Sequence, residues 1–98
     1  MAYKIRYLPL AVQDLHDIAA YLTGFYPDTA GRVLREIETK IARLAQTPRM
    51  YEVYPSHPSY RRLPVSQYLV FYRINDPLQT VEVHRILRGS WNLPRFLE

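Results

Sequence analysis

The stretch that decides the fold is Gln67–Ile74, QYLVFYRI, which is followed after a short turn by Thr80–Arg88, TVEVHRILR. The first run is almost entirely apolar or aromatic, as is typical of a central strand covered on both faces. Asn75-Asp76-Pro77-Leu78 between the two runs is a turn sequence. We therefore predict an antiparallel hairpin that ends at Gly89.

Two helices are predicted on the N-terminal side of this hairpin. Apolar residues recur at helical spacing over about residues 10–24, and again from Ala30 to Leu44. Gly24 and Pro27 end the first helix, Asp28 or Thr29 is available to cap the second, and Thr47-Pro48 ends it. So short a connection predicts an antiparallel helical hairpin.

Two further strands complete the predicted fold. Tyr3–Tyr7 alternates aromatic or apolar residues with basic ones, and Tyr60–Leu63 is a short strand stopped by Pro64. The element order is then β-α-α-β-β-β, a single α+β domain over residues 1–98. We expect the N-terminal strand and the helical hairpin to pack on one face of a small antiparallel sheet, whose other face stays partly open.

Composition excludes several classes of protein. The 98 residues include 48% hydrophobic and 22% charged residues, which is usual for a soluble domain. No apolar run reaches the roughly 18 to 20 residues of a membrane span, and no signal peptide is visible, so we expect a cytoplasmic protein without a membrane partner. The sequence has no cysteine, its three histidines are scattered, and it contains no phosphate-loop or dinucleotide motif. We therefore expect no metal site and no cofactor.

The charge excess lies in the C-terminal part of the chain. Residues 1–58 hold seven Lys or Arg against six acidic residues, whereas residues 59–98 hold six Arg and no Lys against three. The guanidinium group matches phosphate and carboxylate groups with two parallel hydrogen bonds. The excess therefore favours an acidic macromolecular partner, either nucleic acid or an acidic protein.

Strand alternation assigns the polar residues of the hairpin to faces. In a regular strand, Val81, Val83, Arg85 and Leu87 share one face, and Glu82, His84, Ile86 and Arg88 share the other. The valines mark the core face, so we expect Glu82, His84 and Arg88 on the more open one. Arg73 belongs on the face of Leu69 and Phe71, and its partner is either Glu82 or Arg88.

This pattern has two interpretations. One is a cationic face with an imidazole, suited to clamping phosphates and to moving a proton. The other is a solvated sheet face on which His84 simply packs beside Glu82. Arg61 and Arg62 are adjacent and must point to opposite faces, so at most one of them joins the cationic face.

Four segments in order resemble the RelE/ParE superfamily of bacterial type II toxins. They are YKIRYLPLAVQDLHDIAAYL at residues 3–22, ARLAQTPRM at 42–50, YRRLPVSQYLVFYRI at 60–74 and VEVHRILRGSWNLPRFL at 81–97. The resemblance covers nearly residues 2–97. Its most specific part is a helix ending in L-x-x-x-P, followed by Y-R-R and then by Y-L-V-F-Y-R.

The superfamily implies two mechanisms. RelE-like members are ribosome-dependent endoribonucleases, in which basic residues hold the mRNA and a side chain near the C-terminus assists attack by the 2′-hydroxyl. ParE-like members poison DNA gyrase. RelE-like chains place Arg directly after the Tyr of the central strand and carry a Tyr in the tail. Here Leu69 follows Tyr68 and no tyrosine follows Tyr72, which makes the chain more similar to the ParE-like, plasmid-stabilisation branch.

The ParE-like resemblance implies a toxin that inhibits DNA gyrase and is neutralised by a cognate, ParD-like antitoxin of the ribbon-helix-helix type. The residues expected to bind the target or the antitoxin are Arg61, Arg62, Arg73, Arg85, Arg88, Trp91 and Asn92. No catalytic residue is expected in this case. The alternative is a RelE-like endoribonuclease that acts on the ribosome and its mRNA with His84, Arg73 and Arg88. A third possibility is an antitoxin-binding remnant without activity.

Overall fold

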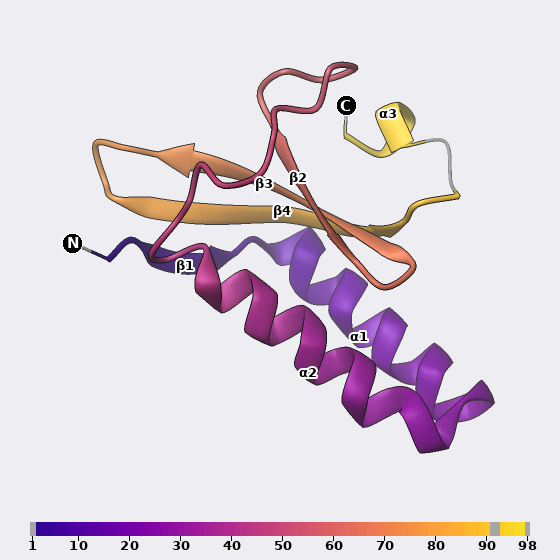
Figure 1. Ribbon diagram of the computed structural model, residues 1–98. Helices are drawn as coiled ribbons and strands as arrows, with labels where there is room; N and C mark the ends of the chain where they lie inside the picture. Colours follow the sequence, from indigo (N-terminus) through magenta and orange to yellow (C-terminus); the bar gives the residue numbers. More distant parts are fainter. Residues whose placement is uncertain (1, 91–92, 98) are drawn as a thin grey trace.

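The computed structural model describes residues 2–90 and 93–97, and it contains a four-stranded sheet with a helical hairpin on one face (Figure 1). In chain order the elements are β1 (Lys4–Tyr7), α1 (Pro9–Phe25), α2 (Pro27–Arg43), β2 (Arg61–Val65), β3 (Tyr68–Asn75), β4 (Thr80–Arg88) and the short α3 (Leu93–Phe96). The predicted α+β fold and the order β-α-α-β-β-β are confirmed.

The sheet is mixed, which corrects the expectation of an antiparallel one. Its strand order is β1-β4-β3-β2. Strands β2, β3 and β4 form an antiparallel meander, but β1 pairs parallel with β4, with Ile5 opposite Val81. The alternation of residues predicts that a segment is a strand. It carries no information about the relative direction of two strands that are separated by most of the chain.

Strand β2 runs through Pro64, where the sequence predicted that it would stop. Pro64 lies opposite Leu69 of β3, and Ser66 and Gln67 then form a two-residue turn in which Ser66 has a φ of 56°. Because β2 is an edge strand, no strand lies on its solvent side. A missing proline N–H on that side therefore removes no hydrogen bond between strands. The position of a strand in the sheet, which the sequence does not show, thus decides whether proline ends it.

The helical hairpin turns within a single residue. Tyr26 alone separates α1 from α2, and Pro27 is the first residue of α2, where a missing N–H is tolerated. Helix α2 therefore begins before Asp28 and Thr29, the residues predicted to cap it, and no side chain in the described part of the chain caps its N-terminus. Thr29 Oγ1 instead donates a hydrogen bond of 3.3 Å to the carbonyl oxygen of Tyr26. The predicted antiparallel hairpin is confirmed.

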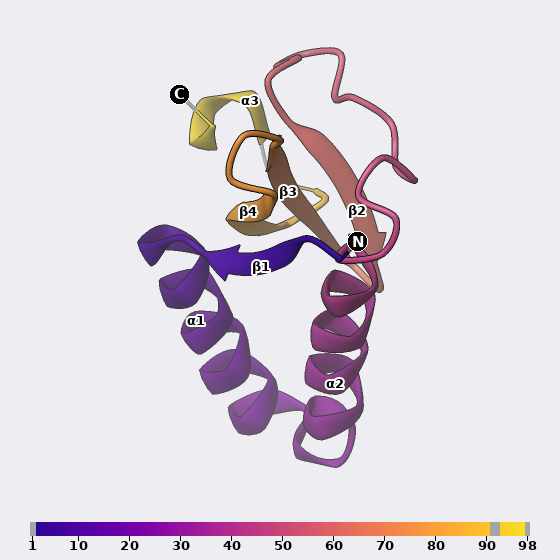
Figure 2. The same cartoon turned by 90° about the vertical axis from the view of Figure 1, so that its left-hand side faces the viewer.

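Hydrophobic side chains fill both sides of the sheet. The main core lies between the helices and the sheet and includes Ile37, Ile41, Val70, Tyr72, Val81 and Val83. The second core lies on the sheet face away from α1 and α2, which we call the outer face, and consists of Tyr54, Tyr60, Phe71, Leu87, Leu93 and Leu97. The segment before β2 and the helix α3 supply part of this second core (Figures 1 and 2). The outer face is therefore covered at one end and open toward the β3–β4 turn.

We expect Tyr72→Phe to destabilise the protein by about 1 kcal/mol, because Tyr72 makes a buried hydrogen bond between the central strand and the segment after α2. Its hydroxyl donates to the carbonyl oxygen of Pro48 at 2.7 Å, and burial raises its pKa to about 12. Urea unfolding measures the change. The control Tyr26→Phe, at a half-exposed position, should stay within about 0.5 kcal/mol of the parent protein. Equal stability of the two variants would contradict the role of this bond.

Candidate functional site

Strand β4 carries one extra residue, His84, opposite β3. The register passes from Tyr72↔Val83 to Phe71↔Arg85, so His84 has no register partner on β3. An extra residue in one strand of an antiparallel pair is a β-bulge, which interrupts the alternation of side chains between the two faces. The predicted sharing of faces along β4 is therefore wrong beyond Val83.

Side chains after the bulge lie on the opposite faces from those predicted. Ile86 is buried in the main core, and the guanidinium of Arg88 lies 5.5 Å from the ring centre of Tyr21 on α1. Leu87 is buried in the second core. Arg88 and His84 consequently do not share a face, although simple alternation placed them together.

Arg85 is held by a carboxylate of α1. Its Nε and Nη2 donate to the two oxygens of Asp14 at 2.7 and 2.9 Å, and the backbone N–H of Ile86 donates to Asp14 Oδ2 at 2.9 Å. Beyond Val83 the described strands leave this edge of β4 unpaired, because β1 has ended. Asp14, only 8% exposed, instead accepts the hydrogen bond of the backbone N–H at this edge. Its hydrogen bonds with the guanidinium raise the pKa of Arg85.

The same guanidinium reaches the C-terminal helix. Arg85 Nη1 donates to the carbonyl oxygen of Phe96 at 3.1 Å, and its guanidinium carbon lies 5.8 Å from the centre of the Phe96 ring. Arg85 thus joins α1, β4 and α3. The helical periodicity of residues 10–24 did not predict this role of Asp14.

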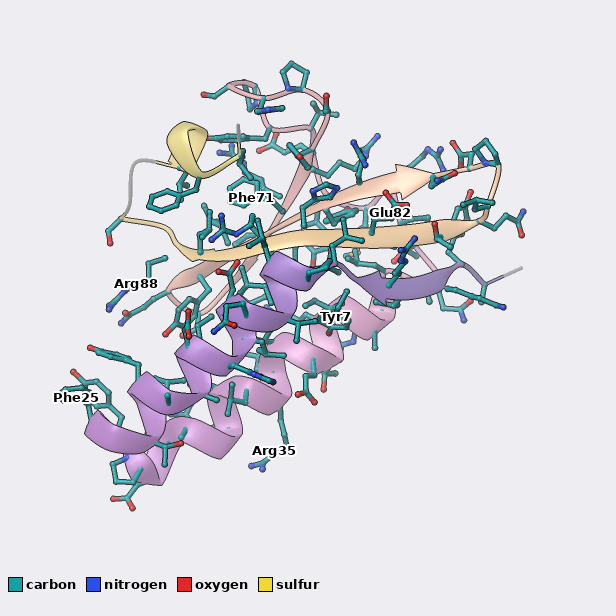
Figure 3. The ribbon with its side chains drawn as sticks, turned by 180° about the vertical axis from the view of Figure 1, so that it is seen from behind. Tyr7, Phe25, Arg35, Phe71, Glu82 and Arg88 are labelled. Carbon is teal, nitrogen blue, oxygen red and sulfur yellow. The ribbon has the colours of Figure 1, made fainter. Side chains whose placement is uncertain are left out.

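Arg73 meets Glu82 on the outer face, which answers the open question about its partner. The two residues are opposite each other in the β3–β4 ladder, and Arg73 Nη2 lies 3.2 Å from Glu82 Oε1. Asn75 Nδ2 donates to the other carboxylate oxygen at 3.4 Å. Burial raises the pKa of Glu82, but the hydrogen bonds from Arg73 and Asn75, together with nearby positive charge, outweigh it, so the pKa is lowered. Figure 3 shows Glu82 on the side of the sheet away from the helices.

His84 is occupied by internal contacts. Its Nδ1 is 3.2 Å from the hydroxyl of Tyr60, and the two rings pack edge to face with centres 4.7 Å apart. Its Nε2 is buried and has no hydrogen-bond partner among the described residues. Burial, and then the charge of Arg73, lower the pKa of His84. The imidazole is therefore uncharged at neutral pH, with one nitrogen bonded to Tyr60 and the other buried.

The remaining predicted arginines lie at separate places. Arg61 Nη1 donates to the carbonyl oxygen of Tyr51 at 2.7 Å. Arg62 forms an ion pair of 3.1 Å with Glu52. Arg88 Nη2 donates to the side-chain oxygen of Gln67 at 2.9 Å. The five arginines of the predicted binding set thus contact different parts of the molecule. Trp91 and Asn92, also in that set, lie outside the described residues.

A cleft beside Arg88 is a feature that the sequence did not predict. A cavity of about 320 Å³ opens between α1 and the end of the sheet, lined by Asp14, Asp17, Ile18, Tyr21, Tyr68, Ile86 and Arg88. A second cavity of about 240 Å³ adjoins it and shares Tyr21, Tyr68 and Arg88. We call the two cavities together the hairpin cleft. Its walls combine three tyrosines, Tyr21, Tyr26 and Tyr68, with the cation Arg88 and the carboxylates of Asp14 and Asp17.

Exposed aromatic rings continue from this cleft to the tip of the helical hairpin. Phe25 and Tyr26 are 70% and 54% exposed, and their ring centres lie 5.0 and 6.1 Å from that of Tyr21. Figure 3 shows Phe25 at the far end of the hairpin from the sheet. The three rings form an exposed apolar cluster that is suited to binding another protein. The aromatic residues around Pro27 were the available signal in the sequence.

The mixed sheet with two helices on one face is the fold of the RelE/ParE superfamily of toxins. Within that superfamily, the family model described as "ParE toxin of type II toxin-antitoxin system, parDE" matches residues 5–93. The chain therefore belongs to the ParE toxin family. No curated protein sequence matches it. None of the helices in residues 2–90 and 93–97 is long and apolar enough to cross a membrane.

Solved structures of such toxins share the fold. The chain is similar to the chromosomal ParDE toxin-antitoxin system of P. aeruginosa, with a TM-score of 0.75, 20% identity, and coverage of 89% of this chain and 96% of that one. It is also similar to the toxin-antitoxin complex RelBE2 of Mycobacterium tuberculosis, with a TM-score of 0.64, 22% identity, and coverage of 90% of this chain and 99% of that one. For a mutant of the E. coli toxin RelE in the free state, the TM-score is 0.73 and the identity 14%, with coverage of 98% of this chain and 93% of that one. ParE and RelE toxins thus have the same architecture.

We expect Asp14→Ala to destabilise the protein by about 2–3 kcal/mol, because it leaves the partly buried guanidinium of Arg85 with the carbonyl oxygen of Phe96 but no carboxylate, and removes the acceptor of the buried N–H of Ile86. Urea unfolding measures the loss. Asp17→Ala removes an exposed carboxylate of the same helix, bonded only at the surface by Gln13, and should change stability by no more than about 0.5 kcal/mol. A similar small effect of both substitutions would show that the ion pair does not hold α1 against β4.

We expect His84 to make the free energy of unfolding depend on pH. Since its folded-state pKa is lowered, its contribution is present above the unfolded pKa of about 6.5 and is lost as the pH falls through the folded pKa. Unfolding in urea at pH 7.5 and 5.5, for the parent and His84→Asn, measures this effect. The parent should lose more stability than the variant on acidification. The comparison with His84→Asn isolates the contribution of His84, and equal losses in the two proteins would contradict the neutral state of His84 in the folded protein.

Proposed function

We propose that this chain is a ParE-type toxin that inhibits DNA gyrase and is neutralised by a cognate antitoxin. The observation that carries the proposal is the match of residues 5–93 to the ParE family model. Toxicity would come from binding and trapping gyrase on DNA, without bond cleavage by the toxin itself. Gyrase is a cytoplasmic enzyme, so the proposal places the chain in the cytoplasm, where it would act in plasmid stabilisation.

The geometry of the polar residues supports a binding protein more than a nuclease. A general base needs a nitrogen within hydrogen-bond reach of the proton that it removes. His84 offers one nitrogen to Tyr60 and buries the other. Arg88, the third residue of the alternative catalytic set, lies against α1 on the other side of the sheet from Arg73. The three residues do not converge on one point.

The alternative function is that of a RelE-like endoribonuclease that cleaves mRNA on the ribosome. The similarity of the fold to that of E. coli RelE favours it, as does the presence of Arg73 and His84 on the same outer face. A substrate that moved the ring of His84 away from Tyr60 would be required. Because the alternative needs this rearrangement, we rank it second.

For the antitoxin, we propose that the hairpin cleft and the adjoining rings of Tyr21, Phe25 and Tyr26 form the docking surface. A ParD-like antitoxin of the ribbon-helix-helix type would place an amphipathic segment there. Apolar side chains of the segment would fill the cleft, and an acidic side chain would pair with Arg88. The solved ParDE and RelBE structures support the presence of such a partner, since they contain toxin-antitoxin systems.

The proposal predicts the outcome of two assays that are run in parallel on purified toxin. In the first, supercoiling of relaxed plasmid by gyrase should be inhibited. In the second, mRNA undergoing translation should stay intact. His84→Ala should inhibit gyrase as well as the parent toxin does, because His84 has no catalytic role in this mechanism. Added antitoxin should relieve the inhibition and serves as the specificity control.

Other outcomes have definite meanings. Unchanged supercoiling together with mRNA cuts that disappear in His84→Ala would replace the proposal by the endoribonuclease. A folded toxin that is inactive in both assays but binds the antitoxin would identify an inactive remnant.

A further inference from the structure

A row of cations crosses the open end of the outer face. Tyr3, Ile5 and Tyr7 pack against the main core, so Lys4 and Arg6 point to the outer face, where they are exposed. The sheet register then places Arg6, Glu82 and Arg73 side by side on three adjacent strands. Residues that are remote in sequence, from β1 and β3, thus meet on one surface.

The row keeps a positive charge, because its three cations, Lys4, Arg6 and Arg73, outnumber its one carboxylate, Glu82. Glu82 is 7% exposed and accepts hydrogen bonds from Arg73 and Asn75, while the side chain of Arg73 stays 47% exposed. The carboxylate therefore lies beneath the row and orients Arg73. Lys4 and Arg6 form no ion pair with any described residue.

The other charged groups near this end are already paired. Arg49 and Asp76 form an ion pair with each other beside the β3–β4 turn, and Tyr3 donates to Asp76. Arg62, farther along the outer face on β2, is paired with Glu52. The surplus charge at the open end thus comes from Lys4 and Arg6, and Arg73 adds a half-exposed guanidinium whose charge Glu82 partly offsets.

The spacing of the row suits a polyanion. Two residues along β1 separate Lys4 from Arg6 by roughly 6.6 Å, which is about two nucleotide steps of one strand of DNA at ~3.4 Å per charge. Arg73 lies two strands away from Arg6, roughly 9.6 Å across the sheet. Long, flexible side chains at these positions are able to contact phosphates of one backbone.

Aromatic rings at this face are not available for bases. Proteins that bind single strands stack unpaired bases on exposed aromatic side chains. Here Tyr54, Tyr60 and Phe71 are buried in the second core, and Phe96 lies over Arg85 at the covered end of the face. The described part of the face therefore offers charge without a stacking platform. This combination fits the backbone of a duplex.

We propose that Lys4, Arg6 and Arg73 form a site for the phosphate backbone of duplex DNA, bound without regard to base sequence. The site is a property of the toxin alone, and it is separate from the hairpin cleft that we assign to the antitoxin. It gives a toxin that acts on a DNA-bound enzyme a direct contact with the DNA. Because the site is measured without gyrase, its failure would leave the assignment of the target untouched.

Fluorescence anisotropy of a labelled duplex of ~20 base pairs, titrated with the full-length toxin, tests the site. Contacts with three phosphates predict weak binding, with a Kd of roughly 10⁻⁴–10⁻⁶ M, and an affinity that falls about 40-fold between 50 and 200 mM salt. Lys4→Ala/Arg6→Ala leaves one contact. Its affinity should be lower on every duplex tested, and its fall over the same salt range should be only about 3- to 4-fold.

The matched control is Arg32→Ala/Arg35→Ala. Both residues are exposed on α2, and Figure 3 shows Arg35 pointing away from the sheet. The control removes the same charge and should keep the parental affinity and salt dependence. Lys4→Gln/Arg6→Gln should repeat the effect of the alanine pair if charge is the cause, and circular dichroism confirms that each variant is folded. An equal loss in the α2 variant, binding that is insensitive to salt, or tighter binding of single-stranded RNA of equal length would each overturn the proposal.

Discussion

The carboxylate of Asp14 is the contact on which the arrangement of the molecule depends. It accepts hydrogen bonds from Arg85 and from the backbone of Ile86 at the point where β1 has ended and the edge of β4 would otherwise be unsatisfied. A helix thereby takes over the role of a missing strand. Arg85 extends the connection to Phe96, so that one partly buried ion pair links the helical hairpin, the sheet and the C-terminal turn.

The bulge at His84 lies directly beside this contact and determines where the cations are displayed. It turns Arg88 toward Tyr21 of α1, while Arg73 remains on the outer face with Glu82. A charged surface and an aromatic cleft therefore lie on opposite sides of one sheet. This division is consistent with a toxin that has to recognise an antitoxin and a target by different chemistry.

Sequence patterns predicted the elements well where a single period dominates, and β4 was predicted with its observed ends. They failed where the outcome depends on a neighbour that is remote in the chain: the parallel pairing of β1, the tolerance of Pro64 at an edge, and the bulge at His84. The residues of the candidate site were also hard to predict where their neighbours are remote in the chain. Counting charges along the chain drew attention to the C-terminal arginines, several of which are engaged by partners such as Asp14. The unpaired cations Lys4 and Arg6 belong to the first strand, and only the sheet register brings them beside Arg73.

The single-residue turn at Tyr26 has a thermodynamic consequence for recognition. A longer connection would leave the rings at the tip of the hairpin free to sample many arrangements, and a partner would have to order them on binding. With Pro27 opening α2 immediately, Tyr21, Phe25 and Tyr26 are carried by helical backbone or by a one-residue corner. The entropy of arranging these rings has thus been lost during folding, so that more of the contact energy is retained as affinity.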